Sequence, residues 1–173
     1  MPLTKIQSLG ITDGTIVNAD INASAAIASS KLSGSLGKVL QVVSTSLASA
    51  AISTTSTSFA DVTGFTASIT PSSASNKILI LVNMPSYVSN SGNGIYLTIL
   101  RGATNLGSSV RGFGYLRGGA DTFGVMSANY LDSPNTTSST TYKLQFKVDS
   151  GSTGEFTSPD GARGTLTLIE IAA

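Results

Sequence analysis

Carboxylates and serines are the residues of this sequence with the most obvious chemistry, since it contains neither histidine nor cysteine. Two carboxylates at a defined separation hydrolyse glycosidic bonds. The nine carboxylates are Asp13, Asp20, Asp61, Asp121, Asp132, Asp149, Glu155, Asp160 and Glu170. No two of them stand out as a pair, and several adjoin Gly, Ser or Pro, where Asp is a common turn former. A glycosidase pair is therefore not predicted.

Nucleophilic and metal chemistry have no better support. A conventional serine triad needs a histidine base, and neither Lys5 nor Lys31 lies in a motif that activates a nucleophile. The segment 149–155, DSGSTGE, offers oxygen ligands but lacks the spaced Asp or Asn positions of a calcium loop, and a hairpin turn explains it better. We expect no catalytic residue, no metal site, no cofactor and no enzymatic activity.

One segment looks like a nucleic-acid motif. The segment 111–118, RGFGYLRG, resembles the aromatic strand motif of RNA-recognition domains over most of its length. Gly118 stands where an aromatic residue is required, and the 10 basic and 9 acidic residues leave no positive footprint. A glycine-rich β-hairpin in which Phe113 and Tyr115 pack is the better interpretation, and we expect no nucleic-acid partner.

The composition favours self-association. Charged residues make up 11% of the chain and the formal net charge is +1, so Ser and Thr must supply most of the polar surface. A surface with so little charge lacks the repulsion that keeps monomers apart. The longest apolar run, 78–82, is far shorter than the roughly 20 residues of a membrane span. The first residues lead into no signal-like apolar region, so we expect synthesis in the cytoplasm, no export by a signal peptide and no membrane insertion.

Residues 1–36 have a spacing that no regular element explains. An Ile or Leu recurs at steps of five or six residues. The positions are Ile6, Ile11, Ile16, Ile21, Ile27 and Leu32. These steps match neither the period of a helix, about 3.6 residues, nor that of a strand, about two. We expect an extended arm, with at most one short helix over 20–32, whose apolar side chains are assembly anchors on a partner surface.

The elements that would position any site begin after a joint at 33–37, SGSLG, because Gly and Ser impose little backbone preference. From Lys38 onward apolar and polar residues alternate, as in strands that have one buried and one solvent-exposed face. Strands are expected at 39–43, 65–69, 77–82, 95–101, 110–115, 122–130, 142–148 and 165–171. The segment 77–82, KILILV, is apolar on both faces, as in a central strand that is covered on both sides. The pattern predicts an all-β domain over 37–173, an antiparallel β-sandwich or jelly roll behind an arm over 1–36.

Aromatic residues and the C-terminal residues are expected in the core of this domain. The phenylalanines, Phe123 among them, are predicted to be buried, because aromatic side chains dominate burial in small domains. The tyrosines have a weaker alternative role on an outer face, in contact with sugars. The sequence is apolar up to Ala173, so we expect a final strand held in a sheet, with Leu168 in the core.

Four blocks of the sequence together resemble virion proteins of tailed bacteriophages, particularly phages of aquatic bacteria and cyanobacteria. The blocks are ITDGTIVNADINASAAIASSKL, GKVLQVVST, FTASITPSSASNKILILV and GTLTLIEIAA. The resemblance covers nearly the whole chain, and it implies a trimeric, β-rich knob preceded by a segment that attaches to another virion protein. It implies no catalytic residue. Because similar blocks occur in tail fibres, short fibres and capsid-decorating proteins, the resemblance identifies a structural family more than a role.

Two roles follow from these expectations, and a third is retained. A single short arm before one knob favours a homotrimer on the virion surface, acting as capsid decoration (cement) or a short fibre. The arm would bind the major capsid protein or another virion protein. The alternative is a receptor-binding tail-fibre tip whose outer loops recognise a host-surface glycan or protein. Its candidate outer-loop contacts are Tyr87, Asn90, Asn93 and Asn105. A depolymerase is the third, enzymatic hypothesis.

Overall fold

A computed structural model describes residues 38–47, 51–156 and 162–173, and these residues form eleven β-strands. The strands are β1 (Val39–Leu47), β2 (Ile52–Thr54), β3 (Ala60–Ile69), β4 (Lys77–Val88), β5 (Gly94–Arg101), β6 (Thr104–Asn105), β7 (Gly114–Arg117), β8 (Thr122–Asp132), β9 (Thr140–Val148), β10 (Gly154–Phe156) and β11 (Gly164–Ile171). They belong to one compact unit, Ser35–Ala173. The arm predicted over 1–36, with its anchors and its short helix, lies outside the described residues.

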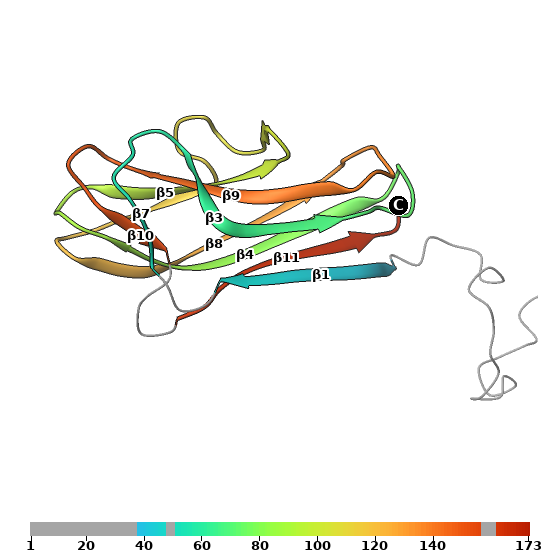
Figure 1. The fold of residues 1–173 in the computed structure, drawn as a ribbon, viewed down its shortest axis with the longest axis horizontal. Coiled ribbons are helices and arrows are strands. Elements are labelled where there is room, and N and C mark those ends of the chain that lie inside the picture. The colour runs from blue at the N-terminus through green and yellow to red at the C-terminus, as the bar shows by residue number, and fades with distance from the viewer. Residues whose placement is uncertain (1–37, 48–50, 157–161) are drawn as a thin grey trace, which may run out of the picture. The chain divides into compact units, whose positions relative to one another are not determined.

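The strands form two antiparallel sheets that face each other (Figure 1). The six-stranded sheet has the order β1-β11-β4-β10-β2, with β8 paired to β4, and the five-stranded sheet has the order β3-β9-β5-β6, with β7 paired to β5. The pairs are nested along the chain: β5 pairs β7, β4 pairs β8, β3 pairs β9 and β1 pairs β11. Nested pairing results when one long hairpin is rolled into two facing sheets, which is the jelly-roll arrangement. The predicted all-β sandwich is confirmed.

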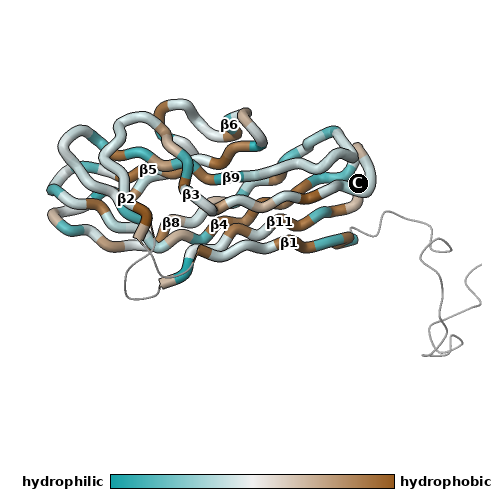
Figure 2. The backbone as a smooth tube through the Cα atoms, viewed as in Figure 1, coloured by the Kyte–Doolittle hydropathy of each residue, from teal (hydrophilic) through white to brown (hydrophobic). Residues whose placement is uncertain are grey.

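Alternating side chains build the core between the sheets. In β11 the side chains of Leu166 and Leu168 are fully buried, while Thr167 between them and Ile169 after them are half-buried. Strand β9 turns Tyr142 and Phe146 inward in the same way, and Phe146 stacks on Phe156 with ring centroids 4.7 Å apart. Figure 2 shows the hydrophobic segments recurring along the strands of both layers. Because β11 lies between β1 and β4, the prediction of a C-terminal strand held in a sheet is confirmed.

Strand β4 is longer than the predicted 77–82 and runs on to Val88. Proline within a sheet is normally confined to edges and irregular positions, because it lacks the N–H that a ladder needs. Pro85 lies where one neighbour of β4 replaces another, since the pairing with β11 ends at Asn83 and the pairing with β10 begins at Ser86. Pro85 therefore lies in the gap between these two pairings, where its missing N–H breaks no ladder hydrogen bond with β11 or β10, and it does not end the strand.

The strand predicted at 110–115 is wrong in position. Strand β7 starts at Gly114, and the residues before it form a turn closed by a bridge between Ser108 and Gly112. Gly112 has a φ of 62°, and a side chain there would collide with the carbonyl group of Leu97. The N–H of Phe113 donates a 2.8 Å hydrogen bond to that same carbonyl. The turn is thus fixed by its contact with β5, which the local sequence does not show.

Candidate functional site

The outer face of the six-stranded sheet, which is turned away from the core, carries a row of aliphatic side chains. The strands β1, β11, β4 and β8 are neighbours in this sheet (Figure 1), and their register places these side chains side by side. In that order they are Val42, Ile169, Leu79 and Leu131. Cross-strand neighbours on one face lie about 5 Å apart, so these side chains form a continuous strip. We call this strip, together with Leu81 beside it on β4, the aliphatic row.

Much of the aliphatic row is exposed. The exposed fraction is 58% for Val42 and 49% for Leu131, and Leu81 is exposed as well. The prediction that 77–82 is covered on both sides is therefore wrong for this unit. Strand β4 has neighbours on both edges, but the core covers only its inner face, where Ile78 and Ile80 are fully buried. An antiparallel sheet needs only one covered face to be stable. The apolar residues of the outer face are therefore not required for this unit to fold.

A second apolar group, the aromatic patch, lies at the other end of the same face. Phe123 is 72% exposed, and Val125 is exposed beside it. The register sets them opposite Tyr87 and Pro85, and the ring centroids of Tyr87 and Phe123 are 4.8 Å apart. The prediction that Phe123 is buried is wrong, because the alternation of β8 turns Met126 inward and therefore turns Phe123 outward.

Uncharged polar side chains separate the aliphatic row from the aromatic patch. The hydroxyl oxygens of Ser44 and Thr167 are 3.0 Å apart, and Asn83 continues this band on β4. Among the described residues of the face, the charged side chains lie at its ends, with Lys77 beyond the aliphatic row and with Glu155 and Asp121 beside Tyr87. The aliphatic row and the polar band can therefore be covered by another surface without burying an unpaired charge, which would be costly.

Strand β8 gives this face an open edge. It pairs with β4, and no other described strand pairs with it. Edge strands are commonly protected by charged residues, proline or bulges. Strand β8 has 11 residues, and one of them is charged. This is the last residue, Asp132, whose side chain is buried. Its long, nearly uncharged edge is the kind that invites contact with another chain.

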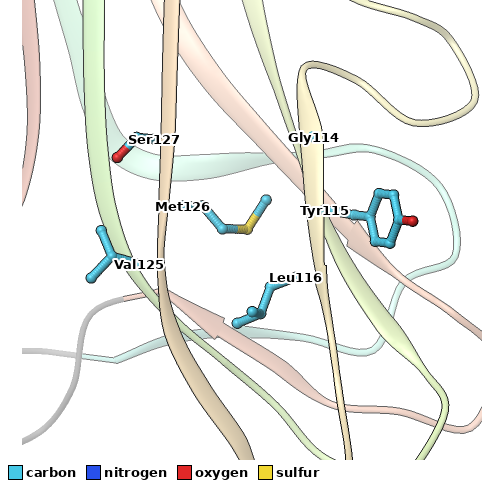
Figure 3. A pocket seen from close by; sticks show the side chains of 6 residues that line it. All are labelled: Gly114, Tyr115, Leu116, Val125, Met126 and Ser127. Atoms are coloured by element: carbon cyan, nitrogen blue, oxygen red, sulfur yellow. The ribbon is translucent and has the colours of Figure 1, made fainter.

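A cavity of about 220 Å³ lies between β8 and β7 of the other sheet. Its lining residues are Gly114, Tyr115, Leu116, Val125, Met126 and Ser127. In Figure 3 the side chains of Leu116 and Met126 point toward one another across this space, while Tyr115 points away from it. The lining contains no carboxylate or amine, so it supplies no acid and base for catalysis.

Three of the four predicted outer-loop contacts, Tyr87, Asn90 and Asn93, lie at one end of the sandwich. Tyr87 belongs to the aromatic patch and donates a 2.6 Å hydrogen bond to Asp121. Asn90 has a φ of 65°, and its amide donates to the loop at 150–151, as does that of Asn93 at 3.5 Å. These two amides hold neighbouring loops together, so they are already used within the domain.

The fourth residue, Asn105, lies elsewhere. It stands opposite Leu100 near the end of β5, whereas Asn93 directly precedes the start of that strand. A separation of six to seven strand residues corresponds to roughly 20 Å. Asn105 also accepts a 2.6 Å hydrogen bond from the hydroxyl of Thr98. The four residues therefore do not form one site, and their role as outer contacts stays a prediction.

Sequence reasoning missed the aliphatic row and, apart from Tyr87, the aromatic patch. The signal that could have found them is that apolar residues of β8 occupy odd-numbered as well as even-numbered positions. Met126 is buried, so the odd-numbered residues of this strand face outward, and Phe123, Val125 and Leu131 are all odd-numbered. When large apolar residues occupy both the odd-numbered and the even-numbered positions of a strand, either both faces of the strand are covered or one apolar face is exposed. Only the structure distinguishes these cases.

Glu170 holds one end of the sandwich together. Its carboxylate is fully buried and accepts hydrogen bonds from the side chains of Gln41 and Asn76, both at 2.6 Å. It also accepts bonds from the N–H and the hydroxyl of Ser72 at 2.7 and 2.8 Å. Burial opposes ionisation, but these hydrogen bonds outweigh it and lower the pKa of Glu170 to about 2. The carboxylate is therefore a structural acceptor.

Asp132 is a second buried structural carboxylate. The Arg101 guanidinium donates to both of its oxygens at 2.8 and 2.9 Å, and the Tyr142 hydroxyl donates at 2.6 Å. Burial, followed by this hydrogen bond, raises the pKa of Tyr142. In the part of the chain that the structure describes, no cluster of acidic residues is placed to hold a metal ion. No helix in that part is long and apolar enough to cross a membrane.

Comparison with known proteins assigns no family. No protein-family model matches the chain, and no curated protein matches it. The resemblance to virion proteins of tailed bacteriophages therefore stays a prediction.

Solved structures show a distant likeness in fold. The structure of infectious bursal disease virus Gx strain is 18% identical over 78% of this chain and 38% of that chain, with a TM-score of 0.40. The VP2 subviral particle of the same virus is 18% identical over 78% and 39% of the two chains, with a TM-score of 0.42. This chain thus spans less than two fifths of the length of those proteins. Similarity at this level assigns no role to any residue described above.

Proposed function

We propose that this chain is a non-enzymatic structural protein of a virus particle, and that it assembles as a homotrimer on the particle surface as capsid decoration (cement) or a short fibre. The exposed apolar face of the six-stranded sheet carries the proposal. A domain with its own complete core has no folding need for the aliphatic row and the aromatic patch, so their exposure indicates a surface that another molecule covers. The protein would be made in the host cytoplasm and would reside in the virion.

The occupant that fits this face is a second copy of the same chain. The middle of the face is uncharged, and the whole chain carries a formal net charge of +1, so copies repel one another weakly. Burying one Val, Leu or Phe side chain contributes about 1.5 to 3 kcal/mol, whereas association costs about 4 to 15 kcal/mol. Copies are therefore held together by burial of the whole face. Around a three-fold axis the aliphatic rows of three copies would meet and exclude water together.

Attachment to the particle is assigned to residues 1–36. The regular spacing of the anchors Ile6 to Leu32 supports binding of the arm to the major capsid protein or another virion protein. Replacing both Ile11 and Ile16 by Asp should leave the domain over 38–173 folded and abolish incorporation into particles, because two anchors would carry charge into an apolar contact. A matched control replaces Thr12 and Thr15 by Asp, which adds the same charge beside the anchors. Normal incorporation of the Ile11→Asp, Ile16→Asp variant would contradict the anchoring role.

The alternative function is a receptor-binding tip of a tail fibre. Loops rich in Gly, Ser and Asn, such as 89–93 between β4 and β5, adapt to varied ligands, and this supports recognition of a host-surface glycan or protein. The two functions differ in copy number. Quantitative mass spectrometry of purified virions against the major capsid protein should give hundreds of copies for capsid decoration. A few tens of copies or fewer would overturn decoration in favour of a fibre or tip.

A further inference from the structure

The outer face of the five-stranded sheet carries a row of aromatic and cationic side chains. The register places Lys147, Tyr96 and Tyr115 side by side on β9, β5 and β7. The two tyrosine rings lie 5.6 Å apart, and the ammonium of Lys147 lies 5.2 Å from the ring centroid of Tyr96. The guanidinium groups of Arg111 and Arg117 lie 5.0 and 5.8 Å from the ring centroid of Tyr115. The three distances from a cation to a ring centroid are within the range of cation–π attraction. We call these five residues the cation-aromatic row.

The row is built on a rigid support. Tyr96 is buried beneath its neighbours, and its hydroxyl donates to the Asp149 carboxylate at 3.1 and 3.2 Å. That carboxylate also accepts from the N–H of Gly94 at 2.9 Å and from Arg117 at 2.8 Å. Arg111 is held by the turn that Gly112 makes possible, since only glycine fits against the Leu97 carbonyl there. The side chains of Tyr96 and Arg117 are therefore held in place by Asp149 before any ligand arrives.

The row retains unused binding capacity. The ion pairs of the described residues use Arg101, Arg117 and Lys143, so Arg111 and Lys147 have no carboxylate partner among those residues. Tyr115 remains 46% exposed although two guanidinium groups lie beside its ring. Three cations and one carboxylate, Asp149, thus meet in a chain whose overall charge is nearly balanced. Burial opposes ionisation of Asp149, but its hydrogen bonds from Gly94, Arg117 and Tyr96 outweigh burial and lower its pKa, so it stays charged.

We propose that the cation-aromatic row is a binding site for an acidic polysaccharide, with a sugar carboxylate on Arg111 and the apolar face of a sugar ring on Tyr115. A guanidinium group pairs with a carboxylate through two parallel hydrogen bonds. The Asp149 carboxylate lies next to this position, paired with Arg117, and can accept a hydrogen bond from a sugar hydroxyl group. The site adds a ligand to the structural role proposed above and does not depend on the trimer.

The same residues fit a nucleic acid less well. Nucleic-acid binding draws most of its affinity from many phosphate contacts, and the row offers three cations. The Asp149 carboxylate can accept hydrogen bonds from the free hydroxyl groups of a polysaccharide, and the backbone of DNA offers no such donors. Single-stranded DNA is therefore a competing outcome of the test.

The test is calorimetric titration of the full chain with hexagalacturonate at about 50 mM salt, where electrostatic contacts are weakly screened. Saturable binding is expected, while a neutral glucose hexamer should bind at least about tenfold more weakly because it lacks carboxylates. Tyr115→Ala and Arg111→Ala, tested separately, should each weaken hexagalacturonate binding about tenfold or more. Both side chains are exposed, and thermal melting checks that each variant is folded. Lys77→Ala is the matched control, because it removes one positive charge from the opposite face.

Three results would overturn the proposal. The first is no heat of binding at hexagalacturonate concentrations up to about 10 mM, a very weak affinity for any specific site. The second is binding that Arg111→Ala and Tyr115→Ala leave unchanged, or that Lys77→Ala weakens equally. The third is an oligothymidylate of similar charge that binds more tightly than hexagalacturonate and loses affinity in the same variants, which would make the row a nucleic-acid site.

Discussion

The two outer faces of the sandwich expose different chemistry although they belong to one fold. The face of the six-stranded sheet leaves Val42, Leu131 and Phe123 in water. The face of the five-stranded sheet is covered by charged and polar side chains, including an ion pair between Lys143 and Asp61 at 2.8 Å. The hydroxyl groups of Ser68 and Thr141 add a 2.7 Å hydrogen bond to it. One face resembles half of a protein interface, and the other resembles an ordinary water-facing surface.

We propose that this difference reflects what each face meets. Both sheets use antiparallel pairing and share one core, so folding constrains their inward-facing residues in the same way. The outward-facing positions are free of that constraint, and their composition therefore reflects water, a ligand or another subunit. We assign the apolar face to other copies of the chain and the cation-aromatic row to a soluble, acidic partner.

The largest expected effect comes from destroying the core on which both faces depend. Leu168→Asp should lower the free energy of unfolding by about 5 kcal/mol, because it buries an unpaired charge. Thr66→Asp, on the exposed side of β3, is the control and should change it by less than about 1 kcal/mol. Chemical denaturation measures both values. Equal stabilities of the two variants would refute the placement of Leu168 in the core.

The next effect separates the two faces. Replacing both Val42 and Leu131 by Lys should weaken association of the copies by about 4 kcal/mol, roughly a thousandfold, because four-carbon ammonium side chains would enter an apolar contact. The monomer should still fold, since both side chains are exposed within one chain. Thr66→Lys together with Ser68→Lys adds the same charge to the other face and should not change association. Sedimentation equilibrium distinguishes these outcomes. If the control pair dissociated the copies, the interface would lie on the five-stranded sheet, and its assignment to the six-stranded sheet would be wrong.

A smaller effect depends on pH. The pKa of Glu170 is about 2 in the folded protein and near its ordinary value of 4.5 after unfolding, so its contribution is fully present above about pH 4.5. It is lost as the pH falls toward 2, which removes about 3 kcal/mol of stability. Glu170→Gln should be less stable at neutral pH and should lose less stability over this pH range. Parallel pH dependences of the two proteins, measured by denaturation, would contradict this role.

The smallest effect concerns the support of the cation-aromatic row. Asp149→Asn should cost about 1 kcal/mol of stability, because it replaces a charge-assisted acceptor for Arg117 and for the N–H of Gly94 by a neutral one. Because the pKa of Asp149 is lowered by folding, the loss should be present at neutral pH and shrink as the pH falls through its unfolded value. Thermal melting at several pH values checks this. A loss that grows on acidification would rule out the proposed support.

The sequence predicted the parts of the fold that follow from alternation within one strand. Strands β9 and β11 were found from their own residues, and Leu168 lies in the core as expected. Alternation does not reveal whether both faces of a strand are covered, and for this reason the exposure of Leu81 and Phe123 was missed. The start of β7 was missed because the turn at Gly112 depends on contact with β5.

The candidate surfaces were less predictable than the fold. The aliphatic row joins Val42, Leu79, Leu131 and Ile169, which are far apart in the sequence and meet only through the nested pairing of four strands. The cation-aromatic row arises in the same way from three strands and a turn. A pattern within one segment predicts which side chains share a face, but the neighbouring strand decides what they form together.

The molecular mass of the unmodified chain in solution tests the central claim, that other copies cover the apolar face. Sedimentation equilibrium at micromolar concentration should give three times the 17.5 kDa mass of one chain. A mass of 17.5 kDa across the concentration range, with the apolar face left in water, would contradict the account.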